Sequence, residues 1–227
     1  MLNVIYEDNH IIVVVKEANI PTQGDKTGDI DLLSKVKEYI KIKYNKPGNV
    51  YVGLVHRLDR MTSGLIVFAK TSKAASRLSK YIREGNFKKK YRCIVNGNTK
   101  DSERLINYLV KNEKTNTSRV TDENNKNAKL AILKYTTIKR YSYNNKEYSL
   151  LEVDLETGRH HQIRVQMSNI GHPLVYDVKY GSKTKGNLAL YSSYLSFYHP
   201  TKDEYLEFNY DILDNENCDN IWKVSNK

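Results

Sequence analysis

The chain has 227 residues, only two cysteines and a formal net charge of +11 at neutral pH. This length is enough to bury a sizeable core, and the excess of lysine and arginine indicates a polyanionic partner, with nucleic acid ahead of an anionic membrane surface. The two distant cysteines exclude a disulfide scaffold and a CxxC zinc site. We also find no apolar run of about 20 residues and no signal-peptide layout, so we expect a cytoplasmic protein without a membrane segment.

The first third of the chain predicts a hairpin, two helices and two further strands. Residues 4–15 contain two β-branched runs separated by three short polar residues, which is typical of a hairpin. A loop follows over residues 16–29, and apolar residues at helical spacing predict an amphipathic helix over 30–44. Strands are predicted at 50–55 and 65–69. Thr71 or Ser72 is a suitable cap for a second helix that ends at Gly85.

The remainder of the chain predicts mainly strands. A basic run leads into a strand that begins at Tyr91, and the polar residues 111–129 indicate a surface excursion rather than a linker. Further strands are predicted at 131–141, 148–155, 188–198 and 205–210, with a short helix from Gln162 to Ile170 and a last helix around Trp222. We therefore predict an α+β fold, a single domain over residues 1–227 on a mixed, mainly antiparallel β-sheet with flanking helices.

The segment His56–Lys70 (HRLDRMTSGLIVFAK) is the main candidate for chemistry, because a polar loop directly precedes an apolar strand. An aspartate between two arginines, such as Asp59, is most often a solvated ion pair. A second basic segment, Glu156–Gln166 (ETGRHHQIRVQ), follows about a hundred residues later. An arginine held against Asp59 would lower the carboxyl pKa and keep it ionised, which suits a nucleophile or a base rather than an acid.

Two other kinds of site fit the sequence less well. The six histidines lack the i, i+4 or CxxC-assisted spacing of a zinc site, so we expect no metal. Ser63, His56 and Asp59 contain the residue types of a hydrolase triad, but neighbours on one loop seldom reach triad geometry, and no GxSxG motif is present.

Three segments carry a resemblance to a known family. HRLDRMTSGLIVFAK, KKKYRCIVNG and ETGRHHQIRVQMSNIGHPLVYDVKYG resemble, in order and spacing, the signature stretches of the RluA-type pseudouridine synthases, which modify ribosomal and transfer RNA. The resemblance runs from about residue 4 to about residue 210. It implies the pseudouridine synthase fold and an isomerase that acts on uridine in RNA by base flipping. We also expect a monomer, and a chain without the separate N-terminal RNA-binding domain that many relatives carry.

The resemblance also implies roles for individual residues. Asp59 matches the catalytic aspartate, Tyr91 the active-site tyrosine that stacks on the uracil, and Arg164 the basic residue that pairs with the aspartate. Arg57 matches the arginine that enters the RNA stack when the base flips out. The other substrate-binding residues expected by this comparison are His56, Thr62, His161, Gln162, Ile163 and Leu190.

The sequence departs from the family pattern at two positions and leaves several questions open. His160 replaces the usual threonine of GRTHQIR, and Tyr176 stands where glycine commonly precedes aspartate. Exchanging a nitrogen–carbon for a carbon–carbon glycosidic bond needs one carboxylate and no metal or redox cofactor, whether Asp59 attacks the ribose or abstracts a sugar proton. Ribosomal and transfer RNA are both open as substrates. The main alternative is a catalytically inactive RNA-binding module of the same fold.

Overall fold

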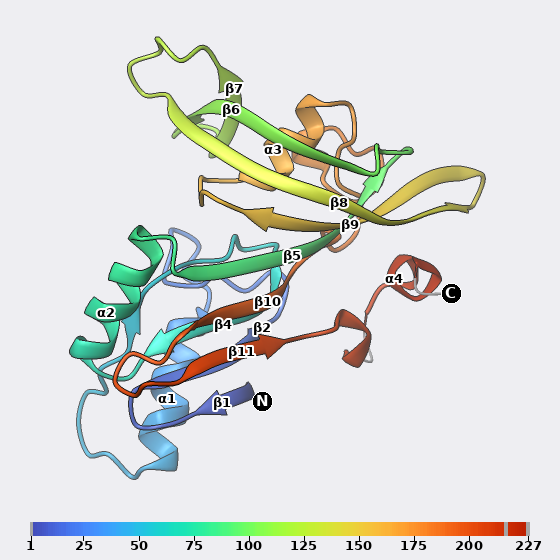
Figure 1. The fold of residues 1–227 in the computed structure, drawn as a ribbon. Helices are drawn as coiled ribbons and strands as arrows, with labels where there is room; N and C mark the ends of the chain where they lie inside the picture. The colour runs from blue at the N-terminus through green and yellow to red at the C-terminus, as the bar shows by residue number, and fades with distance from the viewer. Residues whose placement is uncertain (1, 216–217, 226–227) are drawn as a thin grey trace. The chain divides into compact units, whose positions relative to one another are not determined.

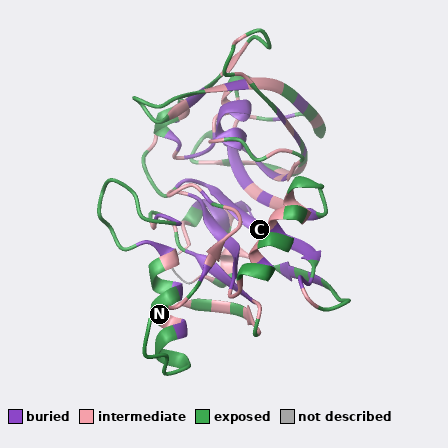
Figure 2. Ribbon diagram, turned by 90° about the vertical axis from the view of Figure 1, so that its left-hand side faces the viewer, coloured by how far each residue is buried: buried purple, intermediate pink, exposed green. Residues whose placement is uncertain are grey.

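The structure, a computed structural model, describes residues 2–215 and 218–225. The chain divides into two compact units: residues 1–89 with 192–210, and residues 90–191 with 211–227. Each unit is described separately below. Buried residues are concentrated on the strands, whereas loops and the outer helix surfaces are exposed (Figure 2).

The first unit combines an antiparallel sheet with two helices (Figure 1). Strand order is β1-β2-β4-β10, with β3 on β4 and β11 on β10. Strands β2 and β4 are buried along almost their whole length, and α2 packs Ala74 and Leu78 against them. The elements are β1 (Asn3–Glu7), β2 (Ile11–Lys16), α1 (Leu32–Lys43), β3 (Gly53–Leu54), β4 (Ser63–Ala69), α2 (Ser72–Arg83), β10 (Leu190–Tyr198, from residue 192) and β11 (Tyr205–Asn209).

The second unit is an antiparallel sheet with strand order β5-β9-β8-β6-β7. Helix α3 follows β9, and its Val165 packs with Leu109 and Ala131 in a core cluster on one face of this sheet. The elements are β5 (Phe87–Asn96, from residue 90), β6 (Ser102–Asn112), β7 (Thr117–Thr121), β8 (Lys129–Tyr143), β9 (Lys146–Leu155), α3 (Gln162–Asn169), η1 (Val178–Tyr180), η2 (Ile212–Asp214) and α4 (Asn220–Ser225).

Most predicted elements are confirmed, with boundaries shifted by a few residues. Thr71 caps α2 by accepting a hydrogen bond from the Ala74 N–H, and Asn144 and Asn145 form the β8–β9 turn with φ of 49° and 57°. Short polar side chains tolerate this left-handed backbone, which matches the twist of a two-residue hairpin. The α+β class of the prediction is confirmed, whereas the single domain stays a prediction.

The structure differs from the prediction at four places. Residues 102–112, which we did not assign, form β6, whose Leu105 and Leu109 are buried on the inward face. The polar excursion 111–129 contains the β6–β7 hairpin, so backbone pairing offsets its lack of apolar residues. The strand predicted at 50–55 is only β3, two residues long, because its neighbours pair with no strand. Ser63 and Gly64 belong to β4 rather than to the loop before it.

Candidate active site

The Asp59 loop joins β3 to β4 in the first unit. The carbonyls of Leu58 and Arg60, the residues on either side of Asp59, accept hydrogen bonds from side chains elsewhere in the unit. The Thr22 hydroxyl donates to the Leu58 carbonyl at 2.7 Å and also accepts from the Leu58 N–H at 3.3 Å. The Lys16 ammonium donates to the Arg60 carbonyl at 2.8 Å. The Asp59 carbonyl accepts the Thr62 N–H at 3.0 Å, which closes a turn. The backbone that carries the Asp59 side chain is therefore fixed on both sides.

Lys16 is fully buried, and its ammonium donates to three carbonyls, those of Glu17, Ile20 and Arg60. Burial lowers the pKa of Lys16 to about 7, although the nearby Asp59 carboxylate opposes this shift. A neutral amine has only two N–H donors, so all three carbonyls are satisfied only by the ammonium form. Lys16 thus supplies a buried positive charge and a backbone support beside Asp59.

Replacing Lys16 with methionine should lower both stability and turnover. The change keeps the aliphatic volume but leaves three carbonyls without their donor, which we expect to cost about 2–4 kcal/mol of unfolding free energy. Turnover should fall because the Arg60 carbonyl, next to Asp59, loses its anchor. Urea unfolding and single-turnover kinetics measure the two effects, with Lys26→Met on the exposed loop as the control. A Lys16→Met protein that unfolds and turns over like the wild type would contradict this support role.

The Arg60 side chain ties the exposed loop 23–30 to the Asp59 loop. It forms ion pairs with Asp25, at 3.4 Å, and with Asp29, and it donates to the Thr27 hydroxyl at 2.9 Å. Arg57, the other arginine of the motif, is exposed. The two arginines that flank Asp59 therefore differ, one paired within the unit and the other presented at its surface.

His56 and Thr62 lie at the two ends of the loop and face the interior of the first unit. His56 Nε2 accepts the Val67 N–H of β4 at 3.3 Å, and its ring lies 5.3 Å from that of Phe87. Burial lowers the pKa of His56 to about 3, so the ring is neutral at physiological pH. Thr62 is almost fully buried. The hydrogen bond to Val67 anchors the loop to β4. The roles of His56 and Thr62 in substrate binding stay predictions.

The other predicted catalytic residues belong to the second unit. Tyr91 lies on β5 opposite Val153 of β9 and is almost fully buried. Arg164 lies on α3 with only 2% of its surface exposed, and its Nε and Nη2 donate to the two carboxylate oxygens of Asp177, both at 2.7 Å. This fork-to-fork geometry fixes the guanidinium plane and compensates its desolvation. The predicted pairing of Arg164 with Asp59, which lies in the other unit, stays a prediction.

The residues at the start of α3 form a hydrogen-bonded support. Gln162 accepts from the Thr157 hydroxyl at 2.8 Å and from the Arg159 N–H at 2.9 Å, and it donates to the Ile132 carbonyl at 3.0 Å. His161 has a left-handed backbone, with φ of 55°, and its ring stacks on that of His160 at 3.8 Å. Ile163 and Leu190 are buried apolar residues of the same unit.

Acidification should destabilise the protein through these histidines. Burial lowers the pKa of His161 to about 2 and that of His160 to about 4. Below pH 6.5 the unfolded chain binds protons that the folded chain does not, so the unfolding free energy falls as pH falls. We expect buried His161 alone to cost about 2 kcal/mol between pH 6.5 and pH 5. Urea unfolding at both pH values measures this, and His161→Gln should reduce the difference. Equal wild-type stability at both values would contradict the prediction.

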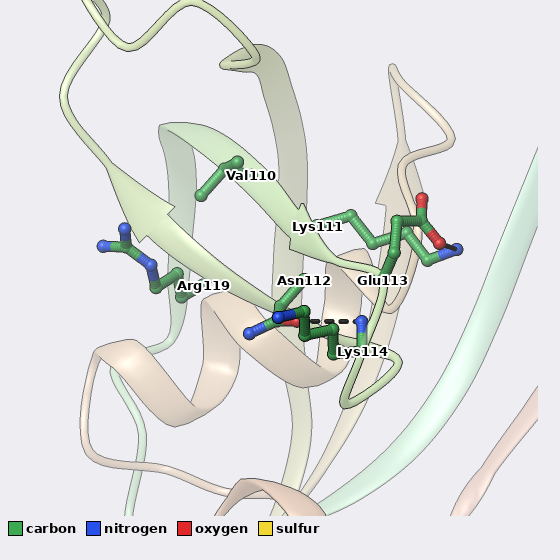
Figure 3. A pocket seen from close by; sticks show the side chains of 6 residues that line it. All are labelled: Val110, Lys111, Asn112, Glu113, Lys114 and Arg119. Carbon is green, nitrogen blue, oxygen red and sulfur yellow. Dashed lines mark hydrogen bonds and ion pairs between the residues drawn. The ribbon is translucent and has the colours of Figure 1, made fainter.

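A surface hollow lies on the β6–β7 hairpin (Figure 3). Lys111 in this hollow is paired with Glu113 at 2.6 Å, and Asn112 accepts the Lys114 N–H at 3.0 Å. The hollow is lined by Val110, Lys111, Asn112, Glu113, Lys114 and Arg119. Its lining contains none of the predicted site residues.

The described residues contain neither a metal-binding cluster nor a helix that could cross a membrane. Within residues 2–215 and 218–225, no group of three or more His, Cys, Asp or Glu side chains is placed to hold a metal ion. Across the same residues, every helix is too short or too polar to traverse a bilayer.

Sequence reasoning missed the residues that hold the site in place. Lys16 and Thr22 support the Asp59 loop, and Asp177 and Tyr180 contact Arg164. The position of a lysine at the end of an apolar strand was the available sequence signal for Lys16. Asp177 and Tyr180 lie in the third signature stretch, but their spacing alone does not indicate a common partner.

Known proteins are similar to this chain in sequence and fold. Residues 10–169 match the sequence profile of the RNA pseudouridylate synthase family. The chain is 34% identical over 221 residues to an uncharacterised RNA pseudouridine synthase of Aquifex aeolicus, covering 91% of this chain and 68% of that protein. It is 33% identical over 227 residues to ribosomal large subunit pseudouridine synthase D of Buchnera aphidicola, covering 92% and 68%. The chain thus spans about two thirds of the length of these relatives.

The solved structure of human RNA pseudouridylate synthase domain containing 1 has a similar fold. Its TM-score is 0.74 over 93% of this chain and 83% of that one, at 22% identity. The fold predicted from the three signature stretches is therefore confirmed. The sequence profile covers two of those stretches, those around Asp59 and Tyr91, completely and the third in part. By sequence and by fold, this chain belongs to the RNA pseudouridylate synthase family of isomerases.

Proposed function

We propose that this chain converts specific uridines of structured RNA to pseudouridine, with Asp59, Tyr91 and Arg164 as its catalytic residues, and that it acts as a monomer in the cytoplasm. The observation that supports this most is the clamped Asp59 loop: Thr22 and Lys16 hold the carbonyls on both sides of the proposed catalytic aspartate. Ribosomal RNA is the substrate we favour over transfer RNA, because a relative covering 92% of the chain is named for the large ribosomal subunit.

The reaction breaks the bond between N1 of uracil and C1′ of ribose and forms a bond between C5 and C1′. Asp59 either attacks C1′ to give a covalent adduct or removes the C2′ proton, and in both routes the carboxylate is regenerated. The detached uracil rotates, C5 bonds to C1′, the C5 proton leaves to solvent, and N1 takes up a proton from solvent. The oxidation state of the nucleoside is unchanged, so the steps balance without a redox partner. A buried positive charge beside Asp59, such as that of Lys16, favours the ionised carboxylate.

We assign Arg57 and Tyr91 separate roles in base flipping. Extruding a stacked uridine costs a few kcal/mol, which an inserted side chain and an aromatic platform partly offset. Arg57 is exposed next to the loop turn, which suits insertion into an RNA stack. Tyr91 is held at a fixed position on β5 and offers the aromatic ring. The remaining predicted contacts with the substrate are those of His56, Thr62, His161, Gln162, Ile163 and Leu190.

Pseudouridine mapping of total RNA from cells with and without this gene tests the proposal. We expect one or a few discrete positions in ribosomal RNA to lose pseudouridine in the deletion strain and to regain it when the wild-type gene is restored. Loss confined to transfer RNA would overturn the substrate assignment but keep the reaction. Identical maps in the two strains, combined with inactivity of the purified protein on their ribosomal RNA, would favour the inactive RNA-binding module.

RNA binding should weaken steeply as salt rises. Because lysine and arginine displace condensed counterions from phosphates, the logarithm of the association constant should fall against the logarithm of salt concentration with a slope of about −3 to −6. Filter binding of a ribosomal RNA fragment between low and physiological salt measures this slope. A flat response would contradict phosphate contacts by the basic surface.

A further inference from the structure

We propose that Tyr180 is a positioning residue for Arg164, whose guanidinium it holds by ring stacking while its hydroxyl is tied to β7 and to His161. The Arg164 Cζ lies 4.9 Å from the centroid of the Tyr180 ring. Asp177 binds the edge of the same guanidinium through two hydrogen bonds. This inference rests on the catalytic role proposed for Arg164.

The Tyr180 hydroxyl joins two elements. It accepts a hydrogen bond from the Ser118 N–H of β7 at 2.8 Å, and its oxygen lies 2.7 Å from Nδ1 of His161. The tautomer of His161 determines which of the two atoms donates in the second contact.

The Tyr180 ring is immobilised by its packing as well as by its hydroxyl. His161 lies edge-on to it, with centroids 5.5 Å apart and an interplanar angle of 89°. The Tyr180 carbonyl accepts from the Ser168 hydroxyl of α3 at 2.7 Å, and the side chain packs against the Leu109, Ala131 and Val165 cluster. Backbone and side chain are thus both attached to elements that surround α3.

The two contacts of Arg164 constrain different motions. The Asp177 carboxylate fixes the guanidinium edge and prevents its translation along the pair, whereas a ring stacked on its face opposes tilting out of that plane. Catalytic groups need positioning to within a fraction of an ångström, so loss of either constraint lowers the rate of the chemical step more than it lowers substrate affinity. Tyr180 is assigned the second constraint.

A double-mutant cycle between Tyr180→Leu and Arg164→Met tests the assignment. Single-turnover rates and RNA dissociation constants are measured with a ribosomal RNA fragment for both single variants and the double variant. We expect Tyr180→Leu to lower the rate at saturating RNA about 30-fold with RNA affinity within about 3-fold, whereas Tyr180→Phe, which keeps the ring, loses about 3-fold. Tyr194→Phe, which removes a hydroxyl bonded to Glu207 in the first unit, is the matched control and should keep the wild-type rate.

The double variant gives the decisive readout. If Tyr180 acts through Arg164, adding Tyr180→Leu to Arg164→Met should slow turnover by no more than about 2-fold. A multiplicative loss would overturn the positioning role, because the tyrosine would then act independently of the arginine. If Arg164→Met alone keeps the wild-type rate, the catalytic role proposed for Arg164 fails instead. Should the leucine variant fail to fold, the same cycle with Tyr180→Phe applies, and its 3-fold loss must disappear in the Arg164→Met background.

Discussion

Replacing Asp59 with alanine is expected to abolish pseudouridine formation while RNA binding stays within about 2-fold of the wild type. The carboxylate is the only group that we assign to bond-making or proton removal at the ribose, so its loss should lower the rate by at least about 10⁴-fold. The fold should persist, because the carbonyls of Leu58 and Arg60, the residues on either side of Asp59, are held by other side chains. Mass spectrometry of a modified RNA fragment measures the product.

Two comparisons make the Asp59 test specific. Asp25→Ala removes an exposed carboxylate of the same unit that pairs with Arg60 at 3.4 Å, and it should retain most of the activity. Asp59→Asn keeps the size of the side chain and should be as inactive as alanine. Turnover by Asp59→Ala at a rate near that of the wild type would refute the proposed mechanism.

Local signals made most of the fold predictable. Helix α2 follows from a capping threonine and from Ala74 and Leu78 one turn apart, which both become buried. The β8–β9 hairpin follows from two asparagines between alternating strands. Strand β6 was missed because its outward face carries Arg104, Ile106 and Tyr108, which blur the alternation that its buried leucines provide.

The predicted site was partly accessible from sequence, because its motif residues are local whereas their supports are not. The HRLD motif predicts Asp59 as a site residue, but the Lys16 side chain that supports its loop lies more than 40 residues earlier in the chain. Sequence spacing also gave no indication that Arg164 is bound by Asp177, 13 residues further along the chain. Periodicity indicates which face of an element is buried, but it does not indicate which distant side chain that face contacts.

Tyr176 illustrates how the chain accommodates a departure from its family pattern. It replaces the usual glycine yet keeps a left-handed backbone, with φ of 67°. Its ring lies against Gly186, where a Cβ atom would come within 2.8 Å of the ring. A glycine at 186 therefore makes room for the aromatic ring at 176, and the backbone that leads into Asp177 keeps the conformation that glycine adopts freely.

Replacing Gly64 with alanine is expected to be the most destabilising single-methyl change in the first unit. Gly64 has φ of +102°, and a Cβ atom there would lie 2.3 Å from the Ser192 carbonyl oxygen and 2.6 Å from its nitrogen. Both obstructing atoms belong to the backbone of β10, so no side-chain rotation relieves the clash. We expect a loss of about 4 kcal/mol or more in unfolding free energy, measured by urea denaturation.

Gly28→Ala separates the two causes of that loss. Gly28 also has positive φ, +74°, but nothing lies within 4 Å of the position of its added Cβ. It should therefore cost only the backbone strain, about 1 kcal/mol. Gly64 on β4 pairs with Lys16 on β2. Gly64→Ala should therefore also displace the start of β4, to which the Asp59 loop is attached, and reduce turnover. Equal losses of stability in the two variants would show that backbone strain alone acts at Gly64 and that β4 and β10 can separate without cost.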